Sequence, residues 1–436
     1  MKMNEIGIGL LGFGTVGAGA VRGLQRNSEV IAERAGARLQ VRRIADLDLD
    51  TDRGVSVDSS VLTTDADAVI ADPEVDIVVE LIGGATAARD LVLKALNSGK
   101  PVVTANKALL AEHGYEIFSA ALENNTDIRF GASVGGGIPI VRALREGLVA
   151  NRIESICGIL NGTCNYILSR MADEGMTFDA ALEEARKAGY AEAEPALDID
   201  GHDTAHKVVV LASLAYGVNV PLDSVYTEGI RGISPLDISR AIQLGYRVKL
   251  AGIISRHPES IEARVHPVLI PAGHMLASVN GVFNAVMVRG DMTEDTLYYG
   301  RGAGSGPTAS TVIGDIVDLA RSLQTGAGTG FLPVAVPGPG NEMLPMGDVR
   351  TRYYLRLCLL DRPGVMAEIT GILGEAGVGI ASVVQDEGAT GEYASVAVVT
   401  HCAVEKDLDK AQEKIAGLDI VESRPVRLRI LGDCRS

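Results

Sequence analysis

A glycine-rich turn close to the N-terminus constrains the fold of this chain more than any other feature. The apolar run 6–11 leads into Gly12-Phe-Gly-Thr-Val-Gly17, and a helix-like run follows it. A strand, a glycine turn and a helix in this order form the context in which the G-x-G-x-x-G pattern predicts a dinucleotide site. Gly12 permits the tight turn, Gly14 lets the backbone approach a pyrophosphate, and Gly17 lets helix and strand pack closely. The residues expected to contact the cofactor here are Gly12, Phe13, Gly14, Thr15, Val16 and Gly17.

The residue that follows the second predicted strand bears on the choice of cofactor. That strand, residues 39–45, ends at Asp46, where an acid is placed to bond a ribose 2′-hydroxyl, as in NAD. Asp46 lies further beyond the glycines than the usual spacing of roughly 20 residues, which a first helix continuing through Ala35 would explain. Arg42 and Arg43 lie beside it and could instead meet the 2′-phosphate of NADP. The sequence therefore favours NAD and leaves NADP open.

Apolar strands continue to alternate with helices through the first third of the chain. Three further strands are predicted, at 75–81, 101–104 and 127–132. This alternation indicates an α/β unit, a Rossmann-type doubly wound parallel sheet covered on both faces. Ligands of such sheets gather at the carboxyl ends of the strands, where Gly83, Ala105 and Lys107 fall. A cation fits poorly at the start of a helix, so a functional role for Lys107 is favoured over a solvated surface lysine.

A cluster of charged residues in the middle of the chain has the composition of a reaction centre. Residues 198–207 hold three aspartates, two histidines and Lys207, and an apolar run follows them. A helix opened by Asp200 or Gly201 would place Asp203 and Lys207 four residues apart on one face. Because the following run is apolar, we expect this helix to be buried. The alternative is a surface salt bridge with a helix cap, which the cofactor site in the same chain makes less favourable.

The pattern changes again after the charged cluster. From 246 to 299 the sequence alternates between apolar and polar residues, which indicates a mainly antiparallel sheet with one covered face. A second glycine loop, 300–307, follows this sheet. The loop could wrap a cofactor through Gly304, or it could serve only as a crossover. The helix after it, residues 306–323, is expected to return to the first domain.

The C-terminal part is predicted to be a compact unit of its own. Residues 324–350 are rich in glycine and proline, as linkers are. The elements predicted after them follow the order strand, helix, strand, strand, helix, strand, which is the ferredoxin-like split βαβ. We therefore divide the chain into a dinucleotide-binding domain, 1–133, and an α+β catalytic and dimerisation domain, 134–305. A linker, 324–350, and a C-terminal domain, 351–436, follow them.

Composition excludes several kinds of partner. A formal net charge of −16 argues against nucleic acid, which requires a basic surface. No window approaches the roughly 18 apolar residues of a membrane span, and the apolar start runs into glycines as no signal peptide does. The five cysteines are scattered and form no C-x-x-C, which favours reduced thiols over a disulfide framework or a zinc site. We expect a cytoplasmic protein that acts on small molecules.

Taken together, the motifs resemble those of homoserine dehydrogenase with a C-terminal ACT domain, from end to end. The segments that carry the resemblance are the glycine turn 12–17, Thr104-Ala-Asn-Lys107, Gly136-Gly-Ile-Pro139, Leu160-Asn-Gly-Thr163, Asp198-Ile-Asp-Gly-His-Asp203 with Lys207, and Asp361-Arg-Pro-Gly364. Several ordered motifs are far more specific than any one of them. The resemblance implies an oxidoreductase that interconverts L-homoserine and L-aspartate 4-semialdehyde with NAD or NADP, in the biosynthesis of threonine, methionine and isoleucine.

The resemblance also implies roles for individual residues. Lys207 would exchange the proton with the substrate oxygen, and Lys107 would assist beside the nicotinamide. Asp203 and Glu192 match the acids that orient the substrate hydroxyl and bind its amino group. Hydride addition to an aldehyde builds negative charge on oxygen, which a cationic lysine both stabilises and protonates. The expected substrate-binding set is Lys107, Gly189, Glu192, Asp198 and Asp203.

A cation site is implied at the predicted hinge between the first two domains. The family holds a monovalent cation, sodium or potassium, on carbonyls that match Val134, Gly136 and Ile138. Backbone carbonyls are suitable ligands for hard cations. The family usually has a glutamate where this chain has Gly131, so the chain departs from the family at this position.

The ACT domain implies a regulatory ligand, here threonine as an end-product amino acid. The residues of its ligand turn are Asp361, Gly364 and Val365. We expect a homodimer, formed through the sheet of the second domain, or a homotetramer. Two rival interpretations remain: another Rossmann dehydrogenase acting on a different small amino-acid alcohol or aldehyde, and a non-catalytic amino-acid sensor that keeps the fold.

Overall fold

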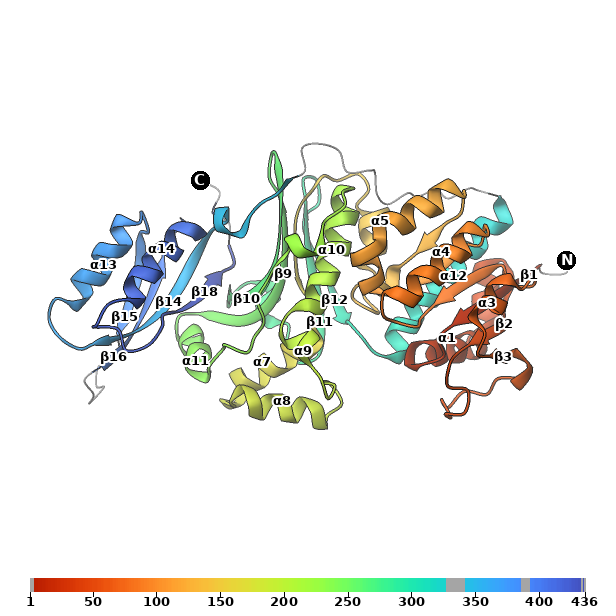
Figure 1. Cartoon of the computed structure of the whole chain (residues 1–436), viewed down its shortest axis with the longest axis horizontal. Coiled ribbons are helices and arrows are strands. Elements are labelled where there is room, and N and C mark those ends of the chain that lie inside the picture. The colour runs from red at the N-terminus through yellow and green to blue at the C-terminus, as the bar shows by residue number, and fades with distance from the viewer. Residues whose placement is uncertain (1–3, 327–341, 386–392, 433, 435–436) are drawn as a thin grey trace.

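The computed structural model of the 436-residue chain describes residues 4–326, 342–385, 393–432 and 434. Figure 1 shows three units in a row, with the N-terminal unit in red and orange at one end and the C-terminal unit in blue at the other. A unit of long strands and helices lies between them. The fold class predicted from the sequence is confirmed. Residues 327–341 of the predicted linker lie outside the described residues.

The N-terminal unit is built on a parallel sheet of six strands in the order β3-β2-β1-β4-β5-β6. The strands are β1 Asn4–Leu11, β2 Ala37–Ala45, β3 Leu62–Thr63, β4 Ile77–Glu80, β5 Val102–Thr104 and β6 Ile128–Arg129. The strand order reverses between β1 and β4, which is where ligands bind in doubly wound sheets. The sequence did not predict the short β3. It predicted too long a last strand, because the chain turns into a 3-10 helix at Gly131.

Helices cover both faces of this sheet. They are α1 Thr15–Arg26, α2 Ser28–Ala35, α3 Ala66–Ala71, α4 Thr86–Asn97, α5 Lys107–Glu123 and α12 Ser305–Thr325. The helix expected to run through Ala35 is two helices that meet at Asn27, and together they fill the long interval before Asp46. Helix α12 packs against α1 (Figure 1), and its Val312 and Ile316 join the apolar core on that face.

The middle unit has an antiparallel sheet with helices on one face. Its strands, in the order β12-β11-β7-β9-β10, are β7 Ile153–Ile159, β9 Tyr246–Arg256, β10 Ser260–Pro271, β11 Phe283–Gly290 and β12 Glu294–Arg301. Its helices are α6 Ile140–Arg142, α7 Gly162–Glu174, α8 Phe178–Lys187, α9 Ala196–Ile199, α10 His202–Tyr216 and α11 Pro235–Gln243. Ile156 and Ile254 pack with Val208 of α10, whereas Ile159 and Ile253 belong to a separate cluster on the other face.

The C-terminal unit has the predicted ferredoxin-like order of elements. These are β14 Arg350–Leu360, α13 Val365–Glu375, β15 Ile380–Gln385, β16 Tyr393–Thr400, α14 Glu405–Ala416 and β18 Val426–Ile430. The sheet order β18-β14-β16-β15 places the last strand beside the first. Three strands of two residues pair at the sides of longer ones. Strands β8 Tyr226–Thr227 and β13 Glu342–Met343 pair with β10 of the middle unit, and β17 Ala403–Val404 pairs with β14.

The middle and C-terminal units share one sheet, which the sequence did not predict. Strand β18 pairs in parallel with β10, with Arg429 opposite Val268 and Ile430 opposite Leu269. A single sheet therefore runs through both units. The pairing joins strands that are far apart in the chain, so no local pattern signals it. The C-terminal unit is consequently held on the middle unit by backbone hydrogen bonds as well as by side chains.

The prediction that all five cysteines are reduced is wrong for two of them. Cys402 and Cys434 form a disulfide, because the chain after β18 returns toward the turn that follows β16. Cys157 and Cys164 are free and buried, and burial raises the pKa of both thiols, which keeps them unreactive. Within the described ranges no helix is long and apolar enough to cross a membrane.

Candidate active site

Helix α10 carries the charged pair predicted at the centre of the chain. It begins after Gly201, whose φ of +90° is one that side-chain-bearing residues rarely adopt. The Lys207 ammonium donates to Asp203 Oδ2 at 2.6 Å and to the Leu160 carbonyl at 2.7 Å. The side chains of Lys207 and Asp203 are 11% and 7% exposed. This pair is buried, so the alternative of a solvated surface salt bridge does not hold.

Asp203 also links the first two units of the molecule. Lys107 is the first residue of α5, and its Nζ lies 3.3 Å from Asp203 Oδ1. Asn106 caps that helix by accepting the Leu109 N–H at 3.1 Å, which fixes the chain where it leaves β5. Burial alone would raise the pKa of Asp203, but the charges of Lys207 and Lys107 outweigh burial and lower it to about 2. Asp203 is therefore an anion at neutral pH that holds one ammonium from each unit.

Asn161 connects a second carboxylate to this cluster. Its amide donates to Asp198 Oδ1 and to Asp203 Oδ2, both at 2.8 Å. The Thr163 hydroxyl donates to Asp198 Oδ2 at 3.1 Å. Burial, followed by the charge of Asp203, raises the pKa of Asp198. The sequence flagged the Leu160–Thr163 motif without choosing Asn161 as a site residue, although its amide bridges the half-buried Asp198 and the buried Asp203.

The structure does not bring the predicted residue Glu192 into the cluster. Gly189, with a φ of +75°, forms the turn after α8, and the Tyr190 carbonyl behind it accepts from Thr163 at 2.7 Å. Glu192 follows on the exposed loop that leads to α9. Among the described residues it makes no hydrogen bond or ion pair, so its carboxylate is free for an incoming ammonium group.

The glycine turn has the geometry that a dinucleotide site needs. Gly12 has a φ of +96°, and a Cβ on Gly17 would lie 2.3 Å from the Gly12 carbonyl oxygen, so only glycine fits there. A Cβ on Gly14 would meet no atom within 4 Å, which leaves the space in front of the turn open. Thr15 and Val16 open helix α1, whose first N–H groups are then free for a phosphate.

Asp46 lies beside the turn, with an arginine that the sequence did not single out. Its Oδ2 accepts the Phe13 N–H at 2.5 Å, and Arg53 Nη2 lies 3.6 Å from its Oδ1. The Arg53 guanidinium also lies over the Phe13 ring, 5.4 Å from its centroid. The candidates proposed for a 2′-phosphate are paired elsewhere, Arg42 with Glu5 and Arg43 with Asp72. Arg53 comes from an irregular loop, where no periodic pattern identifies it.

A buried glutamate at the end of β4 organises the neighbouring loops. Glu80 accepts the Thr104 hydroxyl at 2.5 Å, the Ile82 N–H at 2.8 Å and the Gly83 N–H at 3.3 Å. Burial raises the pKa of this carboxyl. The Asn106 N–H in turn donates to the Thr104 hydroxyl at 3.0 Å. Glu80 therefore positions the chain through Ala105 to Lys107. The sequence missed it, because it lies inside an apolar strand.

The second glycine loop adjoins the first. Gly304 has a φ of +120°, and the Ser305 hydroxyl after it donates to the Thr15 carbonyl at 2.9 Å. This contact brings the N-terminus of α12 to the N-terminus of α1. Gly304 therefore lies close to the predicted phosphate site, although 290 residues separate the two bonded positions.

Three family models match consecutive parts of the chain. The NAD-binding domain of homoserine dehydrogenase matches residues 12–131, homoserine dehydrogenase matches 139–317, and the ACT domain matches 353–419. The homoserine dehydrogenase of Pseudomonas aeruginosa is 44% identical, with 98% of this chain and 99% of that protein covered. The chain belongs to the homoserine dehydrogenase family. The Bacillus subtilis enzyme of this name is 39% identical, with 99% of both chains covered.

Solved structures of homoserine dehydrogenases agree with this assignment. That from Thiobacillus denitrificans superposes with a TM-score of 0.93 at 46% identity, covering 98% of this chain and 99% of the other. A hyperthermophilic archaeal homoserine dehydrogenase in complex with NADPH has a TM-score of 0.61 at 28% identity, covering 73% and 98%. The protein is therefore an NAD(P)-dependent oxidoreductase, a homoserine dehydrogenase with an ACT domain.

Two of the three carbonyls implied as cation ligands at the hinge accept a hydrogen bond from the protein. Val134, Gly136 and Ile138 are buried together, but the Gly136 carbonyl accepts the Thr311 hydroxyl and the Ile138 carbonyl accepts the Ile140 N–H. Across the described residues no group of three histidine, cysteine or acidic side chains could hold a metal ion. A site built on backbone carbonyls needs no such group, so the cation stays a prediction, and no step of the reaction is assigned to it.

A different carboxylate occupies the space beside Gly131. Asp315 of α12 accepts the Gly131 N–H at 2.8 Å. A Cβ on Gly131 would lie 3.0 Å from Asp315 Oδ1, so the two positions share one volume. Burial raises the pKa of Asp315 to about 7. The carboxyl group at this hinge is therefore carried by α12 instead of by residue 131.

The predicted ligand turn of the ACT domain lies between β14 and α13. Gly364, with a φ of +95°, caps α13, and Val365 is its first residue. Asp361 is exposed, and its Oδ1 lies 3.5 Å from the amide nitrogen of Gln385, the last residue of β15. The turn therefore presents the free N–H groups of a helix N-terminus next to a carboxylate.

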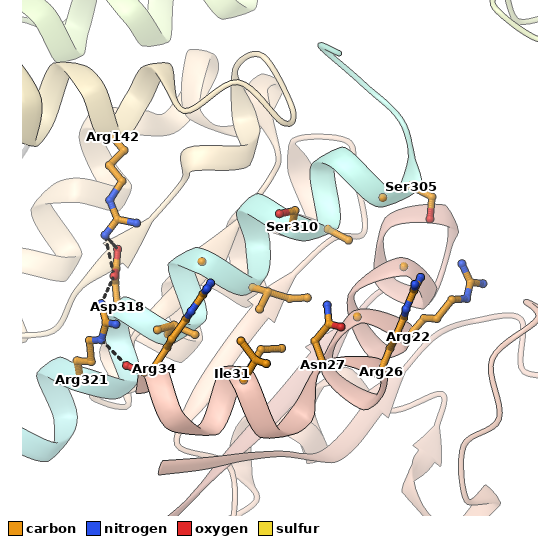
Figure 2. A pocket seen from close by; sticks show the side chains of 18 residues that line it. Arg22, Arg26, Asn27, Ile31, Arg34, Arg142, Ser305, Ser310, Asp318 and Arg321 are labelled. Carbon is orange, nitrogen blue, oxygen red and sulfur yellow. Dashed lines mark hydrogen bonds and ion pairs between the residues drawn. The ribbon is translucent and has the colours of Figure 1, made fainter. Parts of the chain in front are cut away.

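A basic groove lies outside the catalytic cluster of this homoserine dehydrogenase. Figure 2 shows it between α12 and the consecutive helices α1 and α2, with a volume of about 640 Å³. Its labelled arginines are Arg22, Arg26, Arg34, Arg142 and Arg321. Arg142 is engaged by Asp318 at 2.7 Å. None of the predicted catalytic, substrate-binding or cofactor-binding residues lines this groove.

Proposed function

We propose that Lys207 exchanges the proton with the substrate oxygen when L-homoserine and L-aspartate 4-semialdehyde are interconverted. The observation that carries this proposal is the buried contact between Lys207 and Asp203, with Lys107 of the nucleotide-binding unit on the other carboxylate oxygen. The nicotinamide cofactor, when bound, supplies or accepts the hydride at the carbon that bears this oxygen. Lys207 and Lys107 then surround the oxygen with positive charge, which stabilises the negative charge that develops on it.

Asp203 orients the two lysines in this proposal and does not itself transfer the proton. A carboxylate with a pKa of about 2 is too weak a base to hold a proton near neutral pH. Lys207 is the better donor because its ammonium carries three hydrogens. Two of them are directed to Asp203 Oδ2 and the Leu160 carbonyl, which leaves one for the substrate oxygen.

The amino-acid part of the substrate is assigned to the loops around α9. The carboxylates of Asp198 and Asp203 both accept from the Asn161 amide, so they lie close together. Glu192, on the exposed loop before α9, is proposed to close on the substrate ammonium. Gly189 forms the turn before this loop, where its φ of +75° suits glycine.

We also propose that the enzyme accepts NADP as well as NAD. Asp46 can bond a ribose 2′-hydroxyl, and Arg53 beside it can meet a 2′-phosphate, which are the two solutions known for this fold. The support is that Arg53 is only 12% exposed and is held between Asp46 and Phe13. It is therefore already oriented toward the site that the adenosine ribose would occupy.

We further propose that threonine binds the ACT turn at Asp361, Gly364 and Val365 and inhibits the enzyme. The helix N-terminus there suits a carboxylate, and Asp361 suits an ammonium. The domain limits remain those proposed from the sequence, and so does the cytoplasmic location. A homodimer is proposed through the face of the middle sheet that α7 and α10 leave uncovered, with a tetramer as the larger assembly.

The experiment that tests these proposals is an initial-rate assay of the full chain with L-homoserine. NAD and NADP are supplied separately, with and without threonine, and the absorbance of the reduced nicotinamide is followed. We expect turnover with both cofactors and a lower rate with threonine. Threonine binding by calorimetry without any turnover would instead indicate a sensor. Turnover that high threonine leaves unchanged would contradict the regulatory proposal alone.

A further inference from the structure

Two ion pairs between side chains of the middle unit and the C-terminal unit lead to different parts of the enzyme. Arg356 of β14 is bound to Asp237 of α11 through two contacts, at 2.6 Å and 3.2 Å. Arg429 of β18 donates to Glu228, in the segment after β8, at 2.8 Å. Both pairs hold the ACT domain on the catalytic sheet. They differ in the segments that the acidic residue of each pair, Glu228 or Asp237, contacts.

Arg429 is the more deeply buried of the two arginines, with its side chain 1% exposed. Glu405 accepts from it at 2.5 Å and the Tyr226 hydroxyl at 3.1 Å, and its guanidinium lies 4.9 Å from the centroid of the Tyr226 ring. A buried guanidinium must keep its partners, because an uncompensated charge in the interior is strongly unfavourable. The position of Glu228 is therefore tied to that of the last ACT strand.

The residues that follow Glu228 pack directly on the end of α9, the helix before α10. A Cβ on Gly229 would lie 2.2 Å from the Ile199 carbonyl oxygen and 2.5 Å from Asp200 Cα, so the two backbones are in contact. The Ile230 N–H donates to the Ile199 carbonyl at 2.8 Å. On the other side the Glu228 N–H donates to Val265 of β10 at 2.8 Å. The segment 228–230 is held between the catalytic sheet and α9.

Helix α9 carries Asp198, and the residues after it open helix α10. Asp198 is bonded to Asn161, which is bonded to Asp203. Gly201, which caps α10, has the Glu228 carbonyl oxygen 3.4 Å from the place of its Cβ. One short segment thus contacts the ACT domain through the Glu228 side chain. Through its backbone it contacts residues 199–201, which connect Asp198 to the start of α10.

The other pair has no such connection. Asp237 is bonded within its own helix to Ser234, with which it forms a capping box, and to Arg356. Neither side chain of this pair bonds to α9 or to a residue of the catalytic cluster. The Arg356–Asp237 pair therefore fastens the same two units without touching the substrate loops.

We propose that Glu228 is a positioning residue through which the ACT domain, by way of Arg429, holds Asp198 and the start of α10 in place for the substrate. The proposal rests on the assignment of Asp198 to the substrate site. In this proposal the ACT domain supports the substrate site even without an effector. An effector that moves the ACT domain would then change the affinity for homoserine.

The test compares Glu228→Gln with Asp237→Asn in the full-length enzyme. Each variant removes one carboxylate charge from one of the two ion pairs. The KM for homoserine, the KM for the cofactor, kcat and Tm are measured without threonine. For Glu228→Gln we expect the KM for homoserine to rise about fivefold or more, with the cofactor KM and Tm close to wild type. Its side chain is 39% exposed, so the variant is expected to fold.

For Asp237→Asn we expect a lower Tm and an unchanged KM for homoserine, and Arg356→Gln provides the same control if the first variant does not fold. A Glu228→Asp variant, which keeps the charge, should recover part of the lost affinity. Equal effects of the two pairs on the homoserine KM would overturn the proposal, as would a Glu228→Gln enzyme with wild-type KM. Neither result depends on whether Lys207 transfers the proton, so the two proposals fail separately.

Discussion

The predicted cofactor side and the proposed proton-transfer side of the active site differ in what builds them. On the cofactor side the site is formed by backbone, because Gly12 adopts a φ of +96° and Gly17 lies against the Gly12 carbonyl. On the proton side the site consists of charged side chains, with Lys207 and Asp203 buried as an ion pair. The first kind of site is disrupted when an atom is added. The second is disrupted when a charge is removed.

The largest effect is expected on the proton side. Lys207→Ala removes the proposed proton donor and leaves Asp203 with Lys107 and the Asn161 amide. We expect kcat to fall by about 10²–10⁴-fold, the range typical of general acid–base groups. The affinity for the cofactor, measured by nucleotide fluorescence, should stay close to wild type because the glycine turn is untouched. A variant that turns over homoserine at the wild-type rate would remove Lys207 from the mechanism.

The hinge between the two sides should show the next largest effect, in stability. The pKa of Asp315 is raised by burial to about 7, against about 3.9 in the unfolded chain. The folded state therefore binds this proton more tightly, and the resulting stabilisation is present below about pH 4 and lost as the pH rises through about 7. Each tenfold difference in proton affinity is worth about 1.4 kcal/mol.

Asp315→Asn should therefore flatten this part of the pH dependence. The measurement is the free energy of unfolding from urea titrations, at intervals between about pH 5 and pH 8. Wild type is expected to lose stability across this interval and the variant to change less. Parallel curves for the two proteins would show that Asp315 does not carry the effect.

Two substitutions in the glycine turn are expected to distinguish an effect on protein stability from an effect on cofactor binding. Gly17→Ala places a Cβ 2.3 Å from the Gly12 carbonyl oxygen, so we expect a loss of about 1–3 kcal/mol in stability, as for other overpacked sites. Gly14→Ala meets no atom of the protein within 4 Å. It should keep the Tm of wild type and weaken cofactor binding. Equal losses of Tm in both variants would contradict this division.

The smallest effect concerns the choice between the two cofactors. Arg53→Gln removes the guanidinium beside Asp46. We expect the KM for NADP to rise about tenfold, which corresponds to about 1.4 kcal/mol, while the KM for NAD changes much less. Initial rates with each cofactor provide the comparison. A proportionate rise in both values would mean that Arg53 supports the turn through Phe13 and does not select the phosphate.

Local patterns were sufficient to predict the strand, the glycine turn and the helix at the start of the nucleotide-binding unit, because these elements are adjacent in the chain. The cofactor contacts of Gly12, Gly14 and Gly17 were predicted from the same spacing and stay predictions. The i, i+4 relation of Asp203 and Lys207 was equally local, and the structure places both on one face of α10.

What escaped prediction depends on contacts between distant segments. Asn161 lies 37 residues before Asp198 and 42 before Asp203, and nothing near it in the chain reveals that it bridges them. The pairing of Cys402 with Cys434 and the meeting of Asp315 with Gly131 are of the same kind. Arg53 belongs to an irregular loop, and such loops lack a periodicity from which the direction of a side chain can be read.

The most direct test of the account is a crystal structure of the enzyme with oxidised cofactor and L-homoserine bound. We predict that the Lys207 ammonium lies within hydrogen-bond reach, about 3 Å, of the hydroxyl on the carbon that faces the nicotinamide. Asp203 should remain in contact with both lysines in that complex. A hydroxyl that points away from Lys207 and instead bonds another ionisable group would contradict the central claim.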